Sequence, residues 1–326
     1  MKVLLLGATG LLGHNVLQRL MAEGHQVVAL VRCAAGIRLP EGGWETVVGS
    51  PLDYETLSKA AKGCDAVVNC AGCTDMSLRH YEDFLLVNRE LCRLLVRLMD
   101  EQGIGTLVHT STVNTIGFGL KNHPADELVP MEPPFKGSFY ADSKYEGEQI
   151  VLAAAVDGRH VVVLNPGFML GPWDVKPSSG RMLLAAYRKP LMFAPKGGKA
   201  FVHVGDVAQA IVNALTLGEN GNRYIAVNNN CCLSIRELYE MQAKVCGFRQ
   251  RVVAAPNWLL MLAGRVGDML RWMGVKTQVS TRNIRQLLVH EYYCGSLAVK
   301  ELNMPQTALE VAIKEFHEWR KKQSII

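Results

Sequence analysis

The chain has 326 residues, of which 49% are hydrophobic and 20% charged, and it contains 30 glycines. These values are typical of a globular protein of one or two domains, and they exclude collagen, a disulfide-stabilised miniprotein and a disordered tail. The formal net charge is +5, but the Lys and Arg residues are scattered, whereas nucleic-acid binding requires a clustered basic patch. We therefore expect no nucleic-acid partner.

The cysteines indicate a reducing compartment. Nine cysteines and a start that reads directly into a strand, without a signal peptide, predict free thiols and a cytoplasmic location. Cys64, Cys70 and Cys73 lack the paired CxxC motifs of a metal site, so no metal is expected. The longest apolar stretch, 258–264, is far shorter than the ~20 residues that cross a bilayer, so no integral membrane segment is expected.

Strand and helix patterns alternate along the first half of the chain. Strands are predicted at 2–6, 26–31, 46–48, 66–69, 106–110 and 161–164, and helices at 15–23, from 53, at 81–103 and at 138–156. Such a rhythm is typical of parallel βαβ units. It predicts an α/β fold with a Rossmann-type doubly wound parallel sheet.

The rhythm changes after residue 165. Residues 168–200 are rich in Met, Pro, Gly and aromatic residues, and from Leu233 the pattern is mostly helical. Between them we predict a strand at 201–204, a helix from Asp206 as N-cap to Leu217, and a strand at 224–227. The predicted division is a dinucleotide-binding domain over 1–167, to which 201–228 contributes, and a smaller, mostly helical substrate-binding part over 168–200 and 229–326.

A glycine-rich turn, Gly7-Ala8-Thr9-Gly10-Leu11-Leu12-Gly13, joins the first predicted strand to the first helix. Glycines let the backbone turn sharply and approach a pyrophosphate, which the N–H groups and dipole of a helix N-terminus attract. The spacing is GxxGxxG rather than the general GxGxxG, and a merely tight turn is the alternative. Its place in a βαβ unit nevertheless predicts cofactor contacts from Gly7, Thr9, Gly10, Leu11, Leu12 and Gly13.

The end of the second strand distinguishes NAD from NADP. An acidic residue there accepts the ribose 2′-hydroxyl of NAD, whereas an Arg pairs with the 2′-phosphate of NADP. Here the strand ends at Arg32, with Arg38 nearby. The sequence therefore favours NADP, with NAD as the alternative, unless Arg32 is an ordinary solvated cation.

Tyr140 and Lys144 lie four residues apart within a predicted helix. Side chains at this spacing share one helix face. A free phenol has a pKa near about 10, and a neighbouring cation lowers that pKa by stabilising the phenolate. The pair therefore predicts proton transfer, although the same spacing also arises by chance on surface helices.

Five motifs together occur in the order and spacing of the extended short-chain dehydrogenase/reductase superfamily, which the chain resembles over nearly its whole length. They are Gly7-xx-Gly10-xx-Gly13, Asn69-Cys70-Ala71-Gly72, Thr110-Ser111-Thr112, Tyr140-xxx-Lys144 and Asn165-Pro166-Gly167. Residues 201–208 and 291–302 resemble most the branch of dihydroflavonol 4-reductases, 3β-hydroxysteroid dehydrogenases and related NAD-dependent epimerase/dehydratases.

The resemblance implies roles for individual residues. Tyr140 would be the general acid/base, and Lys144 would hold the nicotinamide ribose and lower the pKa of Tyr140. Thr112, favoured over Ser111 by its place in the motif, would bind the substrate oxygen. The other implied cofactor contacts are Asn69, Ala71, Gly72, Asn88, Pro166 and Gly167. For Asn88, holding neighbouring loops is an equal alternative.

Two positions depart from the family's pattern. Ser50 stands where many relatives carry an Asp near the adenine, so a carboxylate at that position is absent. Asn165 stands where relatives often carry Arg before Pro-Gly. The second departure weakens the case for a nucleotide-sugar substrate.

The substrate is expected beyond the carboxyl ends of the strands, beneath the cap. Phe168 and Met169 are the predicted substrate contacts, and further cap residues also suggest an apolar or aromatic substrate, although packing between the two parts explains them equally. These further residues are Trp173, Met182, Tyr187, Met192 and Phe193. The apolar segment 256–274 fits a lid, an interface helix or a membrane-surface helix, and core burial is its simplest interpretation.

The sequence thus predicts an NADP(H)-dependent oxidoreductase that reduces a carbonyl or oxidises a secondary alcohol of a small apolar substrate, with Tyr140 as general acid/base. One alternative is a nucleotide-sugar epimerase or dehydratase with tightly bound NAD. Another is a catalytically idle dinucleotide sensor, against which the intact Tyr140 and Lys144 argue. The expected partner is a small-molecule substrate, and a homodimer is compatible with the sequence.

Overall fold

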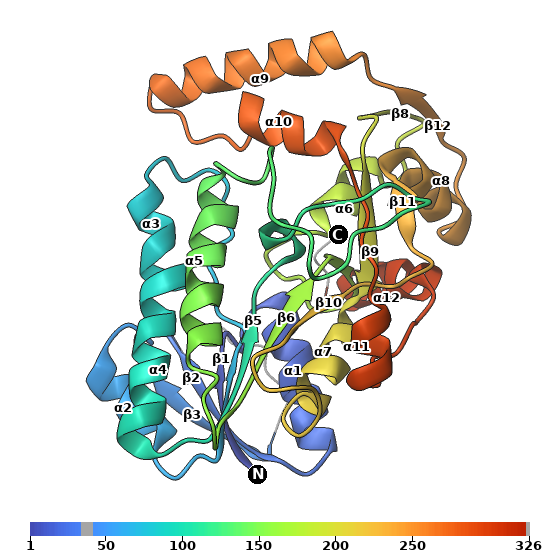
Figure 1. Ribbon diagram of the computed structural model, residues 1–326. Coiled ribbons are helices and arrows are strands. Elements are labelled where there is room, and N and C mark those ends of the chain that lie inside the picture. The colour runs from blue at the N-terminus through green and yellow to red at the C-terminus, as the bar shows by residue number, and fades with distance from the viewer. Residues whose placement is uncertain (34–41, 324–326) are drawn as a thin grey trace.

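The main sheet of the computed structural model has seven parallel strands in the order β10-β6-β5-β4-β1-β2-β3 (Figure 1). Their bounds are β1 Lys2–Leu6, β2 Gln26–Val31, β3 Trp44–Val48, β4 Ala66–Asn69, β5 Thr106–Thr110, β6 His160–Pro166 and β10 Arg223–Ala226. The structure describes residues 1–33 and 42–323. Arg38, named above beside Arg32, lies outside these residues.

Helices cover both faces of this sheet because side chains of each buried strand point alternately to the two faces. Val3 and Leu5 of β1 join one core with α1 (Leu11–Ala22) and α7 (Val204–Asn213). Leu4 and Leu6 join the other core, with α2 (Tyr54–Ala61), α4 (Leu91–Gln102) and α5 (Phe139–Ala153). The predicted doubly wound α/β fold is confirmed.

The winding of the sheet reverses at β1, which lies between β2 and β4. Sheets of this kind bind ligands at such a switch point, outside the carboxyl ends of the strands. Here the glycine turn follows β1 and the Asn69–Gly72 segment follows β4. The topology therefore brings two of the predicted cofactor segments to one crevice.

The long helix predicted at 81–103 has three consecutive parts. These are α3 (Tyr81–Leu85), the π-helical turn η1 (Leu86–Glu90) and α4. π-Helical turns are rare and occur frequently at functional sites. This one contains Asn88.

A smaller, mostly helical part stands beyond the carboxyl ends of the main strands, as predicted. Its helices are α6 (Arg181–Ala186), α8 (Ile235–Val245), α9 (Asn257–Trp272), α10 (Thr281–Leu288) and α12 (Leu309–Lys322). Helix α11 (Ser296–Glu301) instead packs on β10 of the main sheet. The strands of the smaller part are β7 (Phe168–Leu170), β8 (Leu191–Ala194), β9 (Gly198–His203), β11 (Cys232–Ser234), β12 (Arg251–Ala254) and β13 (His290–Glu291). Of these, β7, β9, β11 and β13 form one small sheet.

Two helix predictions were wrong in detail. The first helix begins at Leu11 rather than at 15, because Gly10 is already its N-cap. The helix assigned to Asp206 begins at Val204, and the His203 side chain accepts a hydrogen bond from the Gly205 N–H as its cap. Asp206 lies in the first turn and accepts hydrogen bonds from the backbone N–H and hydroxyl of Thr307, both at 2.7 Å.

The largest correction concerns the segment 256–274. Core burial was the simplest interpretation, but α9 lies at the edge of the molecule, over α10 (Figure 1). Only its two glycines, Gly264 and Gly267, are buried. Within residues 1–33 and 42–323, this and every other helix is too short or too polar to cross a bilayer.

Candidate active site

The glycine turn packs directly on the segment that follows β4. Gly7 has φ of +81°, and a Cβ there would lie 2.6 Å from the carbonyl carbon of Cys70. A Cβ on Gly13 would lie 2.1 Å from the Gly7 oxygen. Neither position tolerates a side chain, because atoms cannot approach this closely. The requirement for glycine therefore follows from close packing of backbone on backbone.

The N-terminus of α1 offers a site for an anion. No side chain caps it, although the first N–H groups of a helix have no partner within the helix. Thr9 and Gly10 are exposed at this end, followed by Leu11, Leu12 and Gly13. The uncapped amides beside a cradle that a Cβ would fill fit a dinucleotide pyrophosphate.

Arg32 stands at the end of β2, as predicted for a 2′-phosphate contact. Its side chain is exposed, and its charge acts on the Cys73 thiol, in the segment after β4. Because β1 and β2 are neighbouring parallel strands, Arg32 and the glycine turn follow strand ends at the same edge of the sheet. Its role in choosing NADP stays a prediction.

The two predicted asparagines use their amides inside the protein. Asn69 Oδ1 accepts a hydrogen bond from the Ala71 N–H at 3.0 Å, and its Nδ2 lies 3.1 Å from Nδ1 of His109. Asn88 Oδ1 accepts from the Cys73 N–H at 2.8 Å, and its Nδ2 donates to Ser143 Oγ at 2.9 Å. These contacts support the structural alternative for Asn88, which ties the segment after β4 to α5.

Tyr140 and Thr112 form the proton-transfer centre of the candidate site. The Tyr140 phenol lies close to the Thr112 hydroxyl and interacts with it. Burial raises the pKa of Tyr140, and the interaction with Thr112 opposes that rise. The resemblance implied a pKa lowered by Lys144, but in this structure burial dominates and the pKa shifts in the opposite direction.

Lys144 lies beneath this centre. Its Nζ donates to the Thr110 carbonyl at 2.6 Å, and a Cβ on Gly72 would be 3.8 Å from the same Nζ. Burial lowers the pKa of Lys144. The predicted lysine, the hydroxyl-rich end of β5 and the segment after β4 therefore meet at one place.

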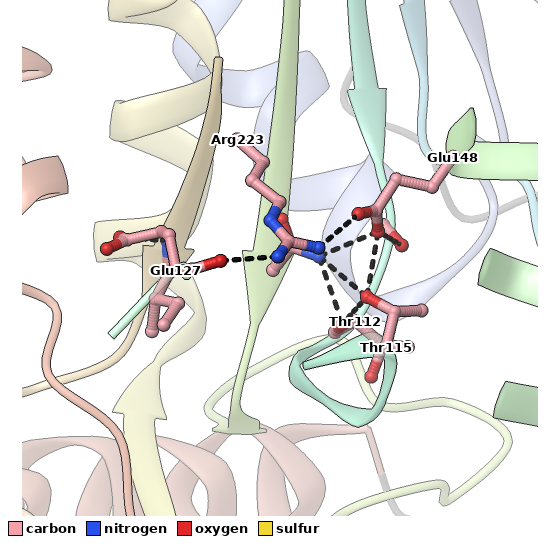
Figure 2. Close-up of polar contacts among 8 residues, drawn as sticks. Thr112, Thr115, Glu127, Glu148 and Arg223 are labelled. Atoms are coloured by element: carbon pink, nitrogen blue, oxygen red, sulfur yellow. Dashed lines mark hydrogen bonds and ion pairs between the residues drawn. The ribbon is translucent and has the colours of Figure 1, made fainter. Parts of the chain in front are cut away.

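A buried carboxylate that the sequence analysis missed supports the same centre (Figure 2). Glu148 follows Tyr140 and Lys144 at the next turn of α5 and is fully buried. Its Oε2 accepts hydrogen bonds from Ser111 Oγ at 2.5 Å and Thr115 Oγ1 at 2.8 Å. Because the Ser111 hydroxyl is engaged by Glu148, Thr112 rather than Ser111 is the hydroxyl residue beside the Tyr140 phenol.

Two further side chains complete the Glu148 cluster. Asn165 Nδ2 lies 2.9 Å from Glu148 Oε2 and also donates to the Thr112 carbonyl at 3.1 Å. Arg223 on β10 pairs with Glu148 Oε1 at 3.1 Å and donates to the Glu127 carbonyl (Figure 2). The cluster thus fixes the backbone of Thr112. The only sequence signal for Glu148 was its spacing, four residues after Lys144, which places it on the same helix face.

Tyr140 also lines a cavity of about 520 Å³. Its walls come from the loop at 76–78, the segment 133–139 and residues of α9 and α10. Cations on these walls include Lys136, Arg271, Arg282 and Arg285. The α9 and α10 contributions were not among the residues predicted to contact substrate.

The predicted substrate residues Phe168 and Met169 do not line this cavity. The Phe168 ring packs edge-on against Phe201, with centroids 5.5 Å apart, and Met169 packs against the core that contains α1 and α7. Pro166 ends β6, and a Cβ on Gly167 would lie 2.5 Å from the Ala200 oxygen. The assigned roles of these four residues stay predictions.

The fold and the site define a dinucleotide-dependent enzyme with a Tyr-Lys pair at the switch point of a Rossmann-type sheet. Residues 3–228 match the model of the NAD dependent epimerase/dehydratase family. The chain belongs to this family, within the extended short-chain dehydrogenase/reductase superfamily, which confirms the resemblance. It is an NAD(P)-dependent enzyme of the oxidoreductase type.

Known proteins of similar sequence and structure cover almost the whole chain. Sterol demethylase protein B of Methylococcus capsulatus is 26% identical, with 100% of both chains covered. A 4-hydroxy-2-methyl-3-oxo-4-farnesyl-3,4-dihydroquinoline-1-oxide ketoreductase of Stigmatella aurantiaca is 27% identical over 87% of this chain and 85% of the relative. The crystal structure of gox2253 has a TM-score of 0.82 and 26% identity, and covers 99% of this chain and 98% of its own.

Proposed function

We propose that the protein is an NADP(H)-dependent reductase of a carbonyl group, with Tyr140 as the proton donor. The observation that carries this proposal is the position of the Tyr140 side chain, which lines a cavity of about 520 Å³ and interacts with the Thr112 hydroxyl. When bound, the dinucleotide supplies a hydride at nicotinamide C4. The protein's own residues supply alignment and the proton.

The pKa of Tyr140 fits the role of proton donor. Because burial raises that pKa, the phenol carries its proton at neutral pH and is ready to donate it to a developing alkoxide. Thr112 would donate a second hydrogen bond to the same oxygen. Lys144 would orient the nicotinamide ribose, and the N–H groups of Leu11, Leu12 and Gly13 would hold the pyrophosphate.

The choice of NADP rests on Arg32. An exposed guanidinium at the end of β2 matches a ribose 2′-phosphate better than a 2′-hydroxyl. We further propose a largely apolar substrate that bears a polar or acidic group. The names of the two relatives describe lipophilic substrates, and the cavity walls combine Met76, Leu78 and Phe84 with arginines.

The test is NADPH oxidation with a panel of lipophilic ketones, followed by the loss of NADPH absorbance. We expect turnover by the unaltered protein and by Tyr145→Phe, a matched control because Tyr145 is an exposed phenol on the same helix. Tyr140→Phe should retain NADPH binding and lose turnover. Tightly bound NAD with no net absorbance change would instead identify an epimerase or dehydratase and contradict the proposal.

A further inference from the structure

The outward side of α9 is largely apolar, and Arg265 is exposed among its large apolar side chains. Exposed large side chains recur there at helical spacing, with Trp258 69%, Leu262 50%, Met269 55% and Trp272 82% exposed. We name as the outer face of α9 the residues Trp258, Leu259, Leu262, Val266, Met269, Trp272 and Met273. An ordinary surface helix exposes its polar side instead.

The opposite side of α9 already has a partner within the chain. A Cβ on Gly264 would lie 3.0 Å from the Thr281 Cα, and one on Gly267 would lie 2.2 Å from the Val279 oxygen. The small side of the helix is therefore packed on the segment that leads into α10. The outer face cannot turn inward without breaking this packing.

A cavity of about 420 Å³ adjoins the outer face. It lies between α9 and the segment 273–280 that leads to α10, which we call the strap. Val266, Leu270 and Val279 are among the apolar side chains that line it. Val275 and Val279 on the strap are also exposed. The apolar surface is thus broad, whereas scattered single apolar residues would need no explanation.

The stretch of chain that carries this surface is strongly basic. Between residues 241 and 290 the only acidic residue of the sequence is Asp268. The cations in the same stretch are Lys244, Arg249, Arg251, Arg265, Arg271, Lys276, Arg282 and Arg285. None of them forms an ion pair with another residue that the structure describes. Their charge therefore remains available to an anionic partner.

We propose that α9 docks the protein on the surface of an anionic lipid bilayer. The outer face would enter the boundary between headgroups and acyl chains, and the surrounding cations would meet the lipid headgroups. Trp258 and Trp272, at the two ends of the helix, have the side chains that favour this boundary. A second copy of this chain fits less well, because a symmetric contact would bring two basic rims together.

Docking would place the candidate active site beside the lipid. Asp268 and Arg271, on another side of α9, line the cavity that Tyr140 shares. Arg271 Nη2 also donates to the Leu78 carbonyl at 2.7 Å, so α9 is tied to the opposite wall of that cavity. A substrate dissolved in the bilayer would then enter the cavity from the docked side. This entry route rests on the proposed function, whereas the docking itself does not.

Vesicle co-sedimentation tests the docking. We expect the full chain to bind vesicles of phosphatidylglycerol and phosphatidylcholine, to bind phosphatidylcholine alone weakly, and to release in high salt. Tryptophan emission should shift to shorter wavelength on binding. Trp258→Gln with Met269→Gln should weaken binding by about tenfold or more, and Arg265→Gln or Lys276→Gln by about fivefold each.

Matched controls separate docking from general effects. Val311→Gln replaces an exposed apolar residue on α12, and Lys314→Gln removes an exposed cation from the same helix. Both should bind vesicles as the unaltered protein does, and unchanged melting temperatures would verify folding. Failure to bind anionic vesicles, binding that the α9 variants do not weaken, or equal binding to neutral vesicles would overturn the proposal. A dimer broken by the α9 variants, without vesicle binding, would do so as well.

Discussion

The crevice of the main sheet and the outer face of α9 are built by different forces. In the crevice, backbone packs on backbone at Gly7 and Gly13, and a buried Glu148 cluster fixes Thr112. On α9, large apolar side chains face outward. The crevice therefore has its shape before any ligand binds, whereas the outer face of α9 has an energetic reason to find a partner.

Substitutions should therefore have different effects in the two regions. A substitution in the crevice removes a contact within the chain and should affect folding or catalysis. A substitution on the outer face of α9 removes little packing within the described structure and should affect mainly association. The predictions below probe this contrast.

The largest effect is expected for Tyr140→Phe. Loss of a positioned general acid costs typically about 10²–10⁴ in rate, so kcat should fall about a thousandfold while the affinity for NADPH stays near that of the unaltered protein. Steady-state kinetics and fluorescence titration of NADPH measure the two quantities. Activity equal to that of the Tyr145→Phe control would remove Tyr140 from the mechanism.

Glu148→Gln should destabilise the protein by about 3 kcal/mol, because it breaks a buried ion pair with Arg223 and leaves that guanidinium without its partner. The free energy of unfolding in urea measures this loss. As Glu148 positions Thr112 through Asn165, kcat should also fall while KM changes little. Glu310→Gln on α12 is the matched control, and equal stability of the two variants would show that the cluster is dispensable.

Acid should destabilise both parts of the molecule through two buried histidines. Burial lowers the pKa of His14, on α1, to about 4, and burial likewise lowers that of His317, on α12, to about 4. The unfolded chain therefore binds these protons more readily, so stability is complete above pH 6.5 and is lost as the pH falls toward 4. The loss should be about 2 kcal/mol per histidine near pH 5.

Unfolding curves at a series of pH values test this prediction. The variants His14→Gln and His317→Gln should each show a smaller loss of stability between pH 6.5 and 5 than the unaltered protein. A pH dependence that neither variant reduces would assign acid sensitivity to other groups.

The smallest effect is expected for Arg32→Asp. Loss of a charge-assisted hydrogen bond to the 2′-phosphate should weaken NADPH about tenfold or somewhat more, with NADH nearly unchanged. Fluorescence titrations of both reduced cofactors give the ratio. An equal loss for the two cofactors would place Arg32 away from the 2′-phosphate.

Much of the fold could be predicted because its signals are local. Strand periodicity and the glycine turn define the sheet and its switch point, and close backbone contacts explain the need for glycine at positions 7 and 13. The cap was less readable. The N-terminus of α7 was also misassigned, because the helix begins at Val204 and the His203 side chain caps it. Asp206 instead accepts a hydrogen bond from Thr307, which is distant in the sequence, so no local pattern indicates that contact.

The site was predictable where its residues belong to one motif and not where they meet through tertiary packing. Tyr140 and Lys144 share a helix face and could be paired from spacing alone. Glu148 and Arg223 come from α5 and β10, and nothing in either segment indicates the other. The exposure of α9 was missed for a related reason, since an apolar helix that faces outward has the same periodicity as one that faces the core.

The most direct test of the central claim is a crystal structure with NADP⁺ bound. The account predicts the pyrophosphate on the N–H groups at the start of α1, and the nicotinamide between Tyr140 and the Pro166–Gly167 segment, with Lys144 at its ribose. A nicotinamide ring remote from the Tyr140 phenol, or a dinucleotide held away from the glycine turn, would contradict it.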